Sequence, residues 1–368
     1  MKRIISQVTK ELAQFRRDRL TLALAFLLPF ATLLIFGFAI RLEAKDIPLV
    51  VQDFDRSYYS QTYIQRLFVT NQFTPIAWND RQPIAQALDE GLAKAIVIIP
   101  HEFSRDIKGG KVGEIQVLVD GTDANNARVI KNSIKAFTNS FAQTQGLLPE
   151  NPPIAARSRL WFNPGRQESL YIVPGVYAVV LWIFPSLLSA IAMVREKEKG
   201  TILQVYASSL SATELILGKS FAYLLIALMM GFCVMGAGAL IFHLRFAGDP
   251  TPYLLTTPVY LWTAVMFGLL LGARSSNQNS AVQGVSIIGF LTSFLLSGFI
   301  YPLSNIPFPL SLLPNIVAAR YYIDVTRDAF VRGTGWSSVW IDLLMIILLG
   351  AFYLHVTRKA MSRMQLNT

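Results

Sequence analysis

Two long apolar runs, residues 171–194 and 221–242, constrain the fold of this chain more than any other feature. Neither run contains Asp, Glu, Lys or Arg. Each exceeds the roughly 20 residues that a helix needs to cross the hydrocarbon core of a membrane. The short charged segment Arg195–Ser220 separates them. Because a charge at the bilayer centre costs at least about 2.5 kcal/mol, we expect this segment to lie at a membrane face.

Four further runs are apolar and nearly as long, namely 20–40, 253–273, 281–300 and 339–356. Charged residues make up only 15% of the chain, against about a quarter in soluble domains. Lysines and arginines gather at one end of alternate runs, which the positive-inside rule assigns to the cytoplasm. We therefore predict a mainly α membrane protein with six transmembrane helices. It is expected in the cell inner membrane, with both termini in the cytoplasm.

Residues 1–19 are predicted to form an amphipathic helix on the cytoplasmic membrane surface. This segment contains six basic residues. Its apolar residues recur at helical spacing, at Ile4, Ile5, Val8, Leu12 and Phe15. Residues 20–40 then form transmembrane helix 1. The alternative is a cleaved signal peptide, whose apolar region would be shorter, about 7–15 residues, and followed by a small-residue cleavage site. Residues 171–357 hold helices 2 to 6, and 358–368 form a cytoplasmic tail.

Residues 41–170 differ in character and are predicted to form an inserted extracytoplasmic α/β domain. Strand-like runs occur at 47–53, 73–78, 94–100 and 114–121. Ser57 is placed to cap a helix that ends near residue 69, and 123–145 carries an apolar stripe at helical spacing. Alternating strands and helices are typical of an α/β domain. The domain follows one transmembrane helix, so a cytoplasmic N-terminus places it outside.

Residues 297–335 are apolar but rich in proline, which argues against a continuous spanning helix. We predict an outer re-entrant segment that ends in a short helix over 319–333, because broken backbone at membrane depth needs shielding by protein. The alternative is an ordinary outer loop with surface ion pairs. Arg320 with Asp324, and Asp328 with Arg332, have the spacing of ion pairs on a helix.

Motifs for catalysis or for metal or nucleotide binding do not stand out. Gly218-Lys219-Ser220 resembles the end of a phosphate-binding loop, but Thr213 replaces the upstream glycine that the motif requires. The single cysteine, Cys233, lies in an apolar run. The net charge of +10 does not indicate nucleic-acid binding, because the basic residues border apolar runs. We expect no enzyme activity, no metal and no cofactor in this chain.

The charged segment also carries a motif. Residues 195–201, Arg-Glu-Lys-Glu-Lys-Gly-Thr, resemble the RERExGT signature of ABC transporter permeases of the type-2 exporter class. The match continues through 210–211 and 214–219, and residues 297–302 and 321–333 resemble further parts of the same family. The layout is similar to a drug-efflux subgroup with a large extracytoplasmic domain between helices 1 and 2.

The resemblance implies a permease subunit of an ATP-driven ABC exporter for a hydrophobic or amphipathic, drug-like small molecule. It implies a separate cytoplasmic ATP-binding subunit that carries the Mg-ATP. It also implies a second permease copy or paralogue and a periplasmic adaptor protein. Membrane lipid is a further expected partner, and nucleic acid is not.

Two groups of site residues follow from the resemblance. The segment 195–220 is expected to couple to the ATPase through a mixed-charge rim around an apolar anchor, with Arg195, Glu196, Lys197, Glu198, Gly200, Thr201, Gln204 and Glu214. The outer re-entrant segment is expected to cap the export path, with Pro302, Pro307, Tyr321, Tyr322, Asp324 and Arg327.

Two alternative functions are considered. One is a permease for lipid or glycolipid export. The other, from a different class, is a membrane-anchored extracytoplasmic sensor or binding protein. A stoichiometric ATPase that co-purifies with the chain would favour a permease, and its absence would favour the sensor.

Overall fold

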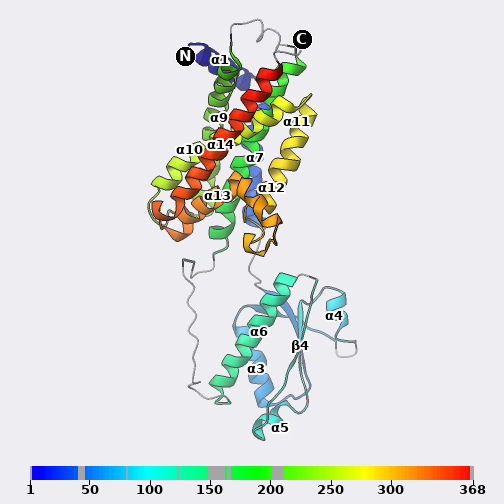
Figure 1. The fold of residues 1–368 in the computed structure, drawn as a ribbon. Coiled ribbons are helices and arrows are strands. Elements are labelled where there is room, and N and C mark those ends of the chain that lie inside the picture. Colours follow the sequence, from blue (N-terminus) through cyan, green and yellow to red (C-terminus); the bar gives the residue numbers. More distant parts are fainter. Residues whose placement is uncertain are drawn as a thin grey trace. The chain divides into compact units, whose positions relative to one another are not determined.

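The computed structural model describes residues 2–39, 46–79, 82–122, 124–147, 162–163, 167–200 and 210–364. The chain divides into two compact units. One consists of Met1–Ile40 with Leu160–Thr368, and the other of Arg41–Arg159. The first is built from helices and the second from a sheet with helices beside it (Figure 1).

Among the described residues, five helices are long and apolar enough to cross a membrane. They are α2 (Arg19–Ala39), α7 (Ser169–Glu198), α9 (Ala212–Ile241), α10 (Thr251–Arg274) and α14 (Trp336–Met364). The predicted class, a mainly α membrane protein, agrees with this. Ahead of them, α1 (Lys2–Arg17) packs against α9 and buries Gln7, Glu11 and Phe15. Ile5 on the flank of α1 stays 60% exposed.

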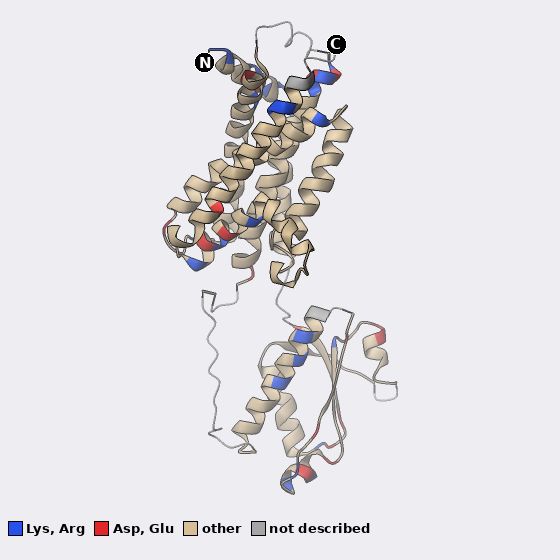
Figure 2. Ribbon diagram, in the orientation of Figure 1, with Lys and Arg blue, Asp and Glu red and all other residues tan. Residues whose placement is uncertain are grey.

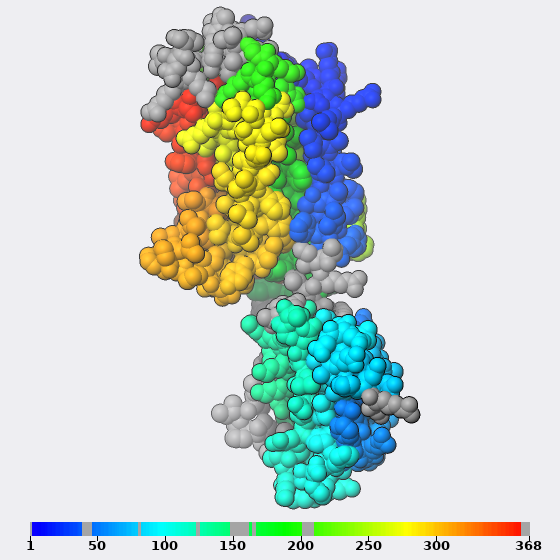
Figure 3. Space-filling model, turned by 90° about the vertical axis from the view of Figure 1, so that its right-hand side faces the viewer, coloured from blue at the N-terminus to red at the C-terminus, as the bar shows by residue number. Residues whose placement is uncertain are grey.

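The apolar run 281–300 is not one regular helix. It holds most of α11 (Gln278–Gly284), a π-helical turn η1 (Val285–Phe290), and α12 (Leu291–Leu295). The helix ends before the predicted Ile300. Gly298 follows with a φ of 83°, a conformation that L-residues with side chains avoid. In Figure 3 this segment (yellow) lies beside α2 (blue), and Phe36 and Phe294 have ring centroids 5.3 Å apart.

The centre of the helical unit is α7, 20 of whose 30 residues are buried between neighbouring helices. It packs closely on α10, where a Gly-x-x-x-Gly pair, Gly268 and Gly272, lets the two backbones approach. A Cβ on Gly268 would lie 2.0 Å from the Ser186 carbonyl oxygen, and one on Gly272 would lie 2.5 Å from that of Ala190. Ser186 also donates to the Ala264 carbonyl at 2.8 Å, which ties the helices together.

Residues 297–335 form short helical turns, as their prolines predict. They contain η2 (Leu303–Asn305), η3 (Leu310–Ile316), α13 (Ala318–Arg327) and η4 (Asp328–Arg332). The short helix that the sequence predicts over 319–333 is confirmed as α13 with η4. It packs against α7, α10 and α14.

The two ion pairs predicted in that helix are wrong. Arg320 instead donates to the side chain of Asn315, and Asp324 lies 3.6 Å from Arg332. Asp328 is buried and accepts from the backbone N–H groups of Thr334 and Gly335 at 3.1 and 2.8 Å. The reason for the second error is η4, because a π-helical turn is wider than an α-turn and no longer aligns residues four apart.

The second unit contains, in its described part, a four-stranded sheet in the order β2-β1-β3-β4. Strand β1 (Ile47–Asp53) runs parallel to β2 (Phe73–Pro75) and β3 (Ala95–Ile99), and β4 (Gln116–Val119) runs antiparallel to β3. All four strands lie within runs that the sequence predicts. Ser57 closes a capping box at the start of α3 (Tyr58–Val69), so this predicted cap is confirmed.

Helices cover both faces of the sheet. On one face, α3 and α6 (Ala124–Thr144) bury Tyr63 and Ile134 against Leu49 and Val97. On the other, α4 (Gln86–Asp89) buries Ala87 against Val50 and Ile96. A further helix, α5 (Phe103–Lys108), was not expected from the sequence. Its six residues are too few to display a helical period.

Candidate functional site

Four consecutive residues at the C-terminal end of α7 reach four different parts of the helical unit. Arg195 contacts the start of α2, and Glu196 contacts α1 and α9. Lys197 contacts the end of α10, and Glu198 contacts the start of α11. Successive residues of an α-helix project about 100° apart, so four neighbours point in different directions. We call Arg195–Glu198 the α7 charge cluster.

Arg195 ties α7 to the start of α2. Its Nη2 lies 3.0 Å from Asp18 Oδ2 and 3.2 Å from Thr21 Oγ1. Asp18 also accepts from the hydroxyl and the backbone N–H of Thr21, at 2.6 and 3.1 Å, and so caps the helix. The Thr21 bonds, with the Arg195 charge in addition, hold the pKa of Asp18 below its ordinary value against the opposing effect of burial.

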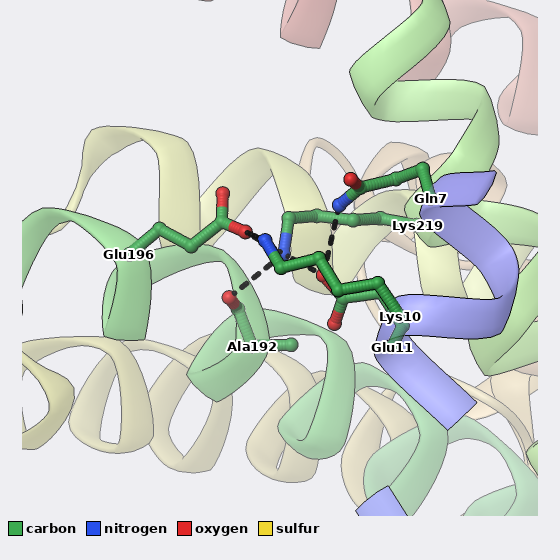
Figure 4. Close-up of polar contacts among 6 residues, drawn as sticks. All are labelled: Gln7, Lys10, Glu11, Ala192, Glu196 and Lys219. Carbon is green, nitrogen blue, oxygen red and sulfur yellow. Dashed lines mark hydrogen bonds and ion pairs between the residues drawn. The ribbon is translucent and has the colours of Figure 1, made fainter. Parts of the chain in front are cut away.

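Glu196 belongs to a buried ion network with residues of α1 and α9 (Figure 4). Its Oε1 lies 2.7 Å from Lys10 Nζ and 3.2 Å from Lys219 Nζ. Lys219 Nζ also lies 2.6 Å from Glu11 Oε1 and donates to the Ala192 carbonyl at 3.2 Å. The network therefore joins α1, α7 and α9 at one point.

The network is balanced in charge, and it is closed to water except at Lys10, whose side chain is 47% exposed. The side chains of Lys219 and Glu11 are only 1% and 3% exposed. Two ammonium groups face two carboxylates, and each charged group has an opposite charge within 3.2 Å. Gln7 adds a hydrogen bond to Glu11 at 2.9 Å. A buried charge without a partner is strongly unfavourable, so this arrangement fixes the position of α1 against α9.

Lys197 and Glu198 bind the ends of neighbouring helices. Lys197 donates to the Ala273 carbonyl and, at 3.4 and 3.2 Å, to the carbonyls of Gly272 and Ser275. Glu198 accepts from the backbone N–H of Gln278 at 2.7 Å and from its side chain. The last carbonyls and first N–H groups of a helix lack partners within it. Each charge also has the sign that the helix dipole favours at its position.

The remaining residues expected in the coupling segment lie just beyond the cluster. Gly200 follows the end of α7 with a φ of 66°. Glu214 forms a capping box with Ser211 at the start of α9, and its Oε2 lies 3.8 Å from Arg3. Thr201 and Gln204 lie outside the described residues, as does the predicted apolar anchor at 202–206.

Glu196, which the sequence places in a mixed-charge rim, is buried in the structure. The residue is only 7% exposed, because Lys10 and Lys219 hold it inside the network. Sequence reasoning also missed the partners Lys10, Glu11, Asp18 and Lys219 as a group. One signal was present, since Glu11 lies four residues from both Gln7 and Phe15 and shares their helical face.

Residues of the outer segment meet at the opposite end of α7. Arg327 donates to the Gly298 carbonyl at 3.0 Å and lies 4.5 Å over the ring of Tyr171. Tyr171 in turn donates to the Phe299 carbonyl at 2.9 Å. These contacts bring the start of α7, the turn after α12 and α13 together.

The other predicted outer residues divide into buried and exposed ones. Tyr322 is fully buried, with its hydroxyl 2.8 Å from that of Thr257 and its ring stacked 3.9 Å from that of Tyr260. Tyr321 donates to the Asn315 carbonyl at 2.8 Å. Pro302 and Pro307 are exposed and Asp324 is partly exposed, so the structure does not bring them into this cluster.

Charge is distributed unevenly over the helical unit. Lysines and arginines gather at the end where α1 and the C-terminal end of α14 lie, whereas the middle of the unit is largely uncharged (Figure 2). Within the part of the chain that the structure describes, no group of three or more His, Cys, Asp or Glu could hold a metal ion.

The contacts of the α7 charge cluster connect the end of α7 to α1, α2, α9, α10 and α11, so a movement of α7 would be transmitted to all five helices.

Comparisons with known proteins agree with this architecture. The family described as ABC-2 family transporter protein matches residues 19–357. The chain is 27% identical over 370 residues to the probable multidrug ABC transporter permease YbhR of Escherichia coli, covering 98% of this chain and 99% of the relative. It is 23% identical to the probable multidrug ABC transporter permease YbhS of the same organism, covering 97% and 96%. The chain therefore belongs to the ABC-2 family of transporter proteins, as a membrane permease subunit that is not itself an enzyme.

Proposed function

We propose that this chain is the transmembrane subunit of an ATP-driven exporter, and that segment 195–220 docks on a separate cytoplasmic ATP-binding subunit. The observation that supports this most is the α7 charge cluster, which anchors the start of the segment to five other helices. A displacement of the segment by a docked subunit would therefore reach these helices together. The residues proposed to carry coupling are Arg195, Glu196, Lys197, Glu198, Gly200, Thr201, Gln204 and Glu214.

We propose six spans for this subunit, the five long helices and the segment α11–η1–α12. The basic residues of α1 and those near the end of α14, Arg358 and Lys359, favour a cytoplasmic position for both termini. An even number of spans is required to bring both termini to one side. Residues 41–170 would then form an extracytoplasmic domain.

The transported molecule is proposed to be hydrophobic or amphipathic, because the relatives YbhR and YbhS are named as probable multidrug permeases. Six helices form half of a transport path, so a second permease copy or paralogue completes it. The extracytoplasmic domain offers a surface for a periplasmic adaptor protein. ATP binding on the partner subunits shifts the population between inward-open and outward-open states. The outer segment with Pro302, Pro307, Tyr321, Tyr322, Asp324 and Arg327 caps the path.

The decisive experiment reconstitutes the full chain in liposomes with the ATP-binding subunit that co-purifies with it. ATP hydrolysis and export of a lipophilic cationic dye are measured together. Glu198→Ala removes the hydrogen bonds to Gln278 that join α7 to α11, and we expect dye export per ATP hydrolysed to fall at least fivefold. Asp249→Asn, an exposed carboxylate just before α10 that belongs to neither proposed group of site residues, is the matched control and is expected to leave the ratio unchanged.

Two outcomes would contradict the proposal. If no ATP-binding subunit co-purifies in a fixed ratio, the chain is not part of an ATP-driven exporter of this kind. If Glu198→Ala leaves the ratio of export to hydrolysis unchanged while the complex stays intact, the α7 charge cluster does not transmit coupling.

A further inference from the structure

A basic cleft of about 640 Å³ lies where α1, α2 and α7 meet. Its lining contains one carboxylate, that of Asp18. It also contains five cationic side chains, those of Lys10, Arg17, Arg19, Arg195 and Lys199. They come from the end of α1, the start of α2 and the end of α7. The cleft is distinct from the buried network, although Lys10 contributes to both.

Three of the five cations have no partner among the residues that the structure describes. Arg195 is paired with Asp18 and Lys10 with Glu196. Arg17, Arg19 and Lys199, by contrast, have no ion pair or side-chain hydrogen bond with any residue that the structure describes. Like charges gathered around one cleft repel each other, and this repulsion is relieved when an anion enters. The cleft is therefore built for a ligand that carries negative charge.

The position of the cleft indicates which anion it binds. Arg19 is the first residue of a helix long and apolar enough to cross a membrane, so the cleft lies at the level where the hydrocarbon core ends. The next part of α2 exposes large apolar side chains, with Leu20 at 72% and Leu27 at 64% exposure. A charged site directly above an exposed apolar helix face matches a molecule with a phosphate at one end and acyl chains at the other.

We propose that this cleft binds the headgroup phosphate of an anionic phospholipid whose acyl chains lie along α2. Arg17, Arg19 and Lys199 contact the phosphate, while Arg195 and Lys10 add to the positive potential. Bound lipid would brace α1 against α2 and α7. The inference goes beyond the proposed export function and does not depend on which subunit docks at segment 195–220.

The test uses the purified full chain in a neutral detergent and measures phosphatidylglycerol binding by native mass spectrometry and by the rise in thermal unfolding midpoint. The test variant is Arg17→Gln with Arg19→Gln and Lys199→Gln. Each basic side chain near an anionic lipid contributes about fivefold to affinity, so we expect binding to weaken at least tenfold. The matched control, Lys2→Gln with Arg16→Gln and Arg274→Gln, removes three positive charges outside the cleft and is expected to change binding less than twofold.

Further arms separate the possible ligands. Phosphatidylcholine and inorganic phosphate at equal concentration are expected to bind at least tenfold more weakly than phosphatidylglycerol. Equal binding of inorganic phosphate would show an anion site with no role for the acyl chains and would overturn the proposal. Unchanged phosphatidylglycerol binding in the cleft variant would also overturn the proposal. If that variant binds the lipid normally but loses its ATP-binding subunit, the cleft is a protein contact and not a lipid site.

Discussion

Replacing Lys219 by methionine tests whether the buried ion network holds α1 in place. Methionine keeps an unbranched side chain only one atom shorter but removes the charge that lies 2.6 Å from Glu11 and 3.2 Å from Glu196. Glu196 keeps Lys10 at 2.7 Å, whereas Glu11, only 3% exposed, keeps no cation nearby among the described residues and is left with the amide of Gln7. The main effect of the substitution is therefore one buried carboxylate without a counter-charge.

The expected cost is large for a single substitution. Removing one partner of a buried ion pair typically destabilises by about 3–5 kcal/mol. For a unit of this size, about 2–4 °C is lost for each kcal/mol, so the midpoint of thermal unfolding should fall by about 10 °C. The double variant Glu11→Gln with Lys219→Met removes both charges. It should recover to within about 1–2 kcal/mol of the wild type, because no lone buried charge remains.

The assay is thermal unfolding of the purified full chain in detergent, followed by tryptophan fluorescence. Arg332→Met is the matched control, because its pair with Asp324 is 3.6 Å long and both side chains are more than 40% exposed. Exposed pairs of this kind are worth about 0–1 kcal/mol. The reasoning would be refuted if Lys219→Met lowered the midpoint no more than the control, or if the double variant were less stable than Lys219→Met alone.

Three further predictions concern other parts of the chain. Gly268→Val should destabilise the helical unit by at least about 3 kcal/mol in the same unfolding assay, because its Cβ would lie 2.0 Å from the Ser186 carbonyl oxygen and overpacking a core is costly. Gly236→Ala, where a Cβ would meet nothing within 4 Å, should be neutral or stabilising, and equal losses in the two variants would contradict the packing argument. The contribution of Asp18 should depend on pH, since its folded-state pKa lies below the ordinary value of 3.8. The stability difference between wild type and Asp18→Asn should be constant above about pH 5 and shrink as the pH falls below about 4, whereas a difference that grew in acid would have the wrong sign. In the α/β unit, burial raises the pKa of Tyr63 to about 12, so its contribution to stability is complete below pH 10 and lost as the pH rises toward 12. Absorbance titration of wild type against Tyr63→Phe should place the missing phenolate transition near pH 12 rather than near pH 10.

The strands and the long helices could be predicted because each follows from a local pattern. Residues 47–53 are bounded in the sequence as they are in β1, and each of the five long helices overlaps one of the predicted apolar runs. The interruption of the run 281–300 could not be predicted in this way. Its π-helical turn packs Gly289 close to Phe267 and Trp182, which lie on other helices. Hydropathy indicates whether a segment lies in lipid or in water. It does not indicate how the side chains of neighbouring helices will pack against that segment.

The charged residues show the same limit at the candidate site. The sequence directs attention to residues 195–198, because charges between two apolar runs must be solvated or paired. The sequence does not indicate which of these charges are solvated and which are paired. Glu196 and Glu198 look alike in the sequence, yet one is buried beside Lys219 and the other binds the start of α11. The environment of each glutamate depends on a partner about 23 or 80 positions away in the sequence, Lys219 or Gln278. The packing of the helices brings each partner close.

A buried ion network at this position has a use that apolar packing would not supply. Replacing buried ion pairs by apolar residues is often neutral or stabilising, so stability alone does not explain the network. Apolar side chains would, however, allow α1 to slide along α9 and α7 with little change in contact. A slide of one helical turn, about 5.4 Å, would separate Glu11 from Lys219 and Lys10 from Glu196 at once, and would leave the carboxylate of Glu11, only 3% exposed, without a cation. The network therefore sets the register of α1 against α7 and α9, so that any movement of α7 must carry α1 with it.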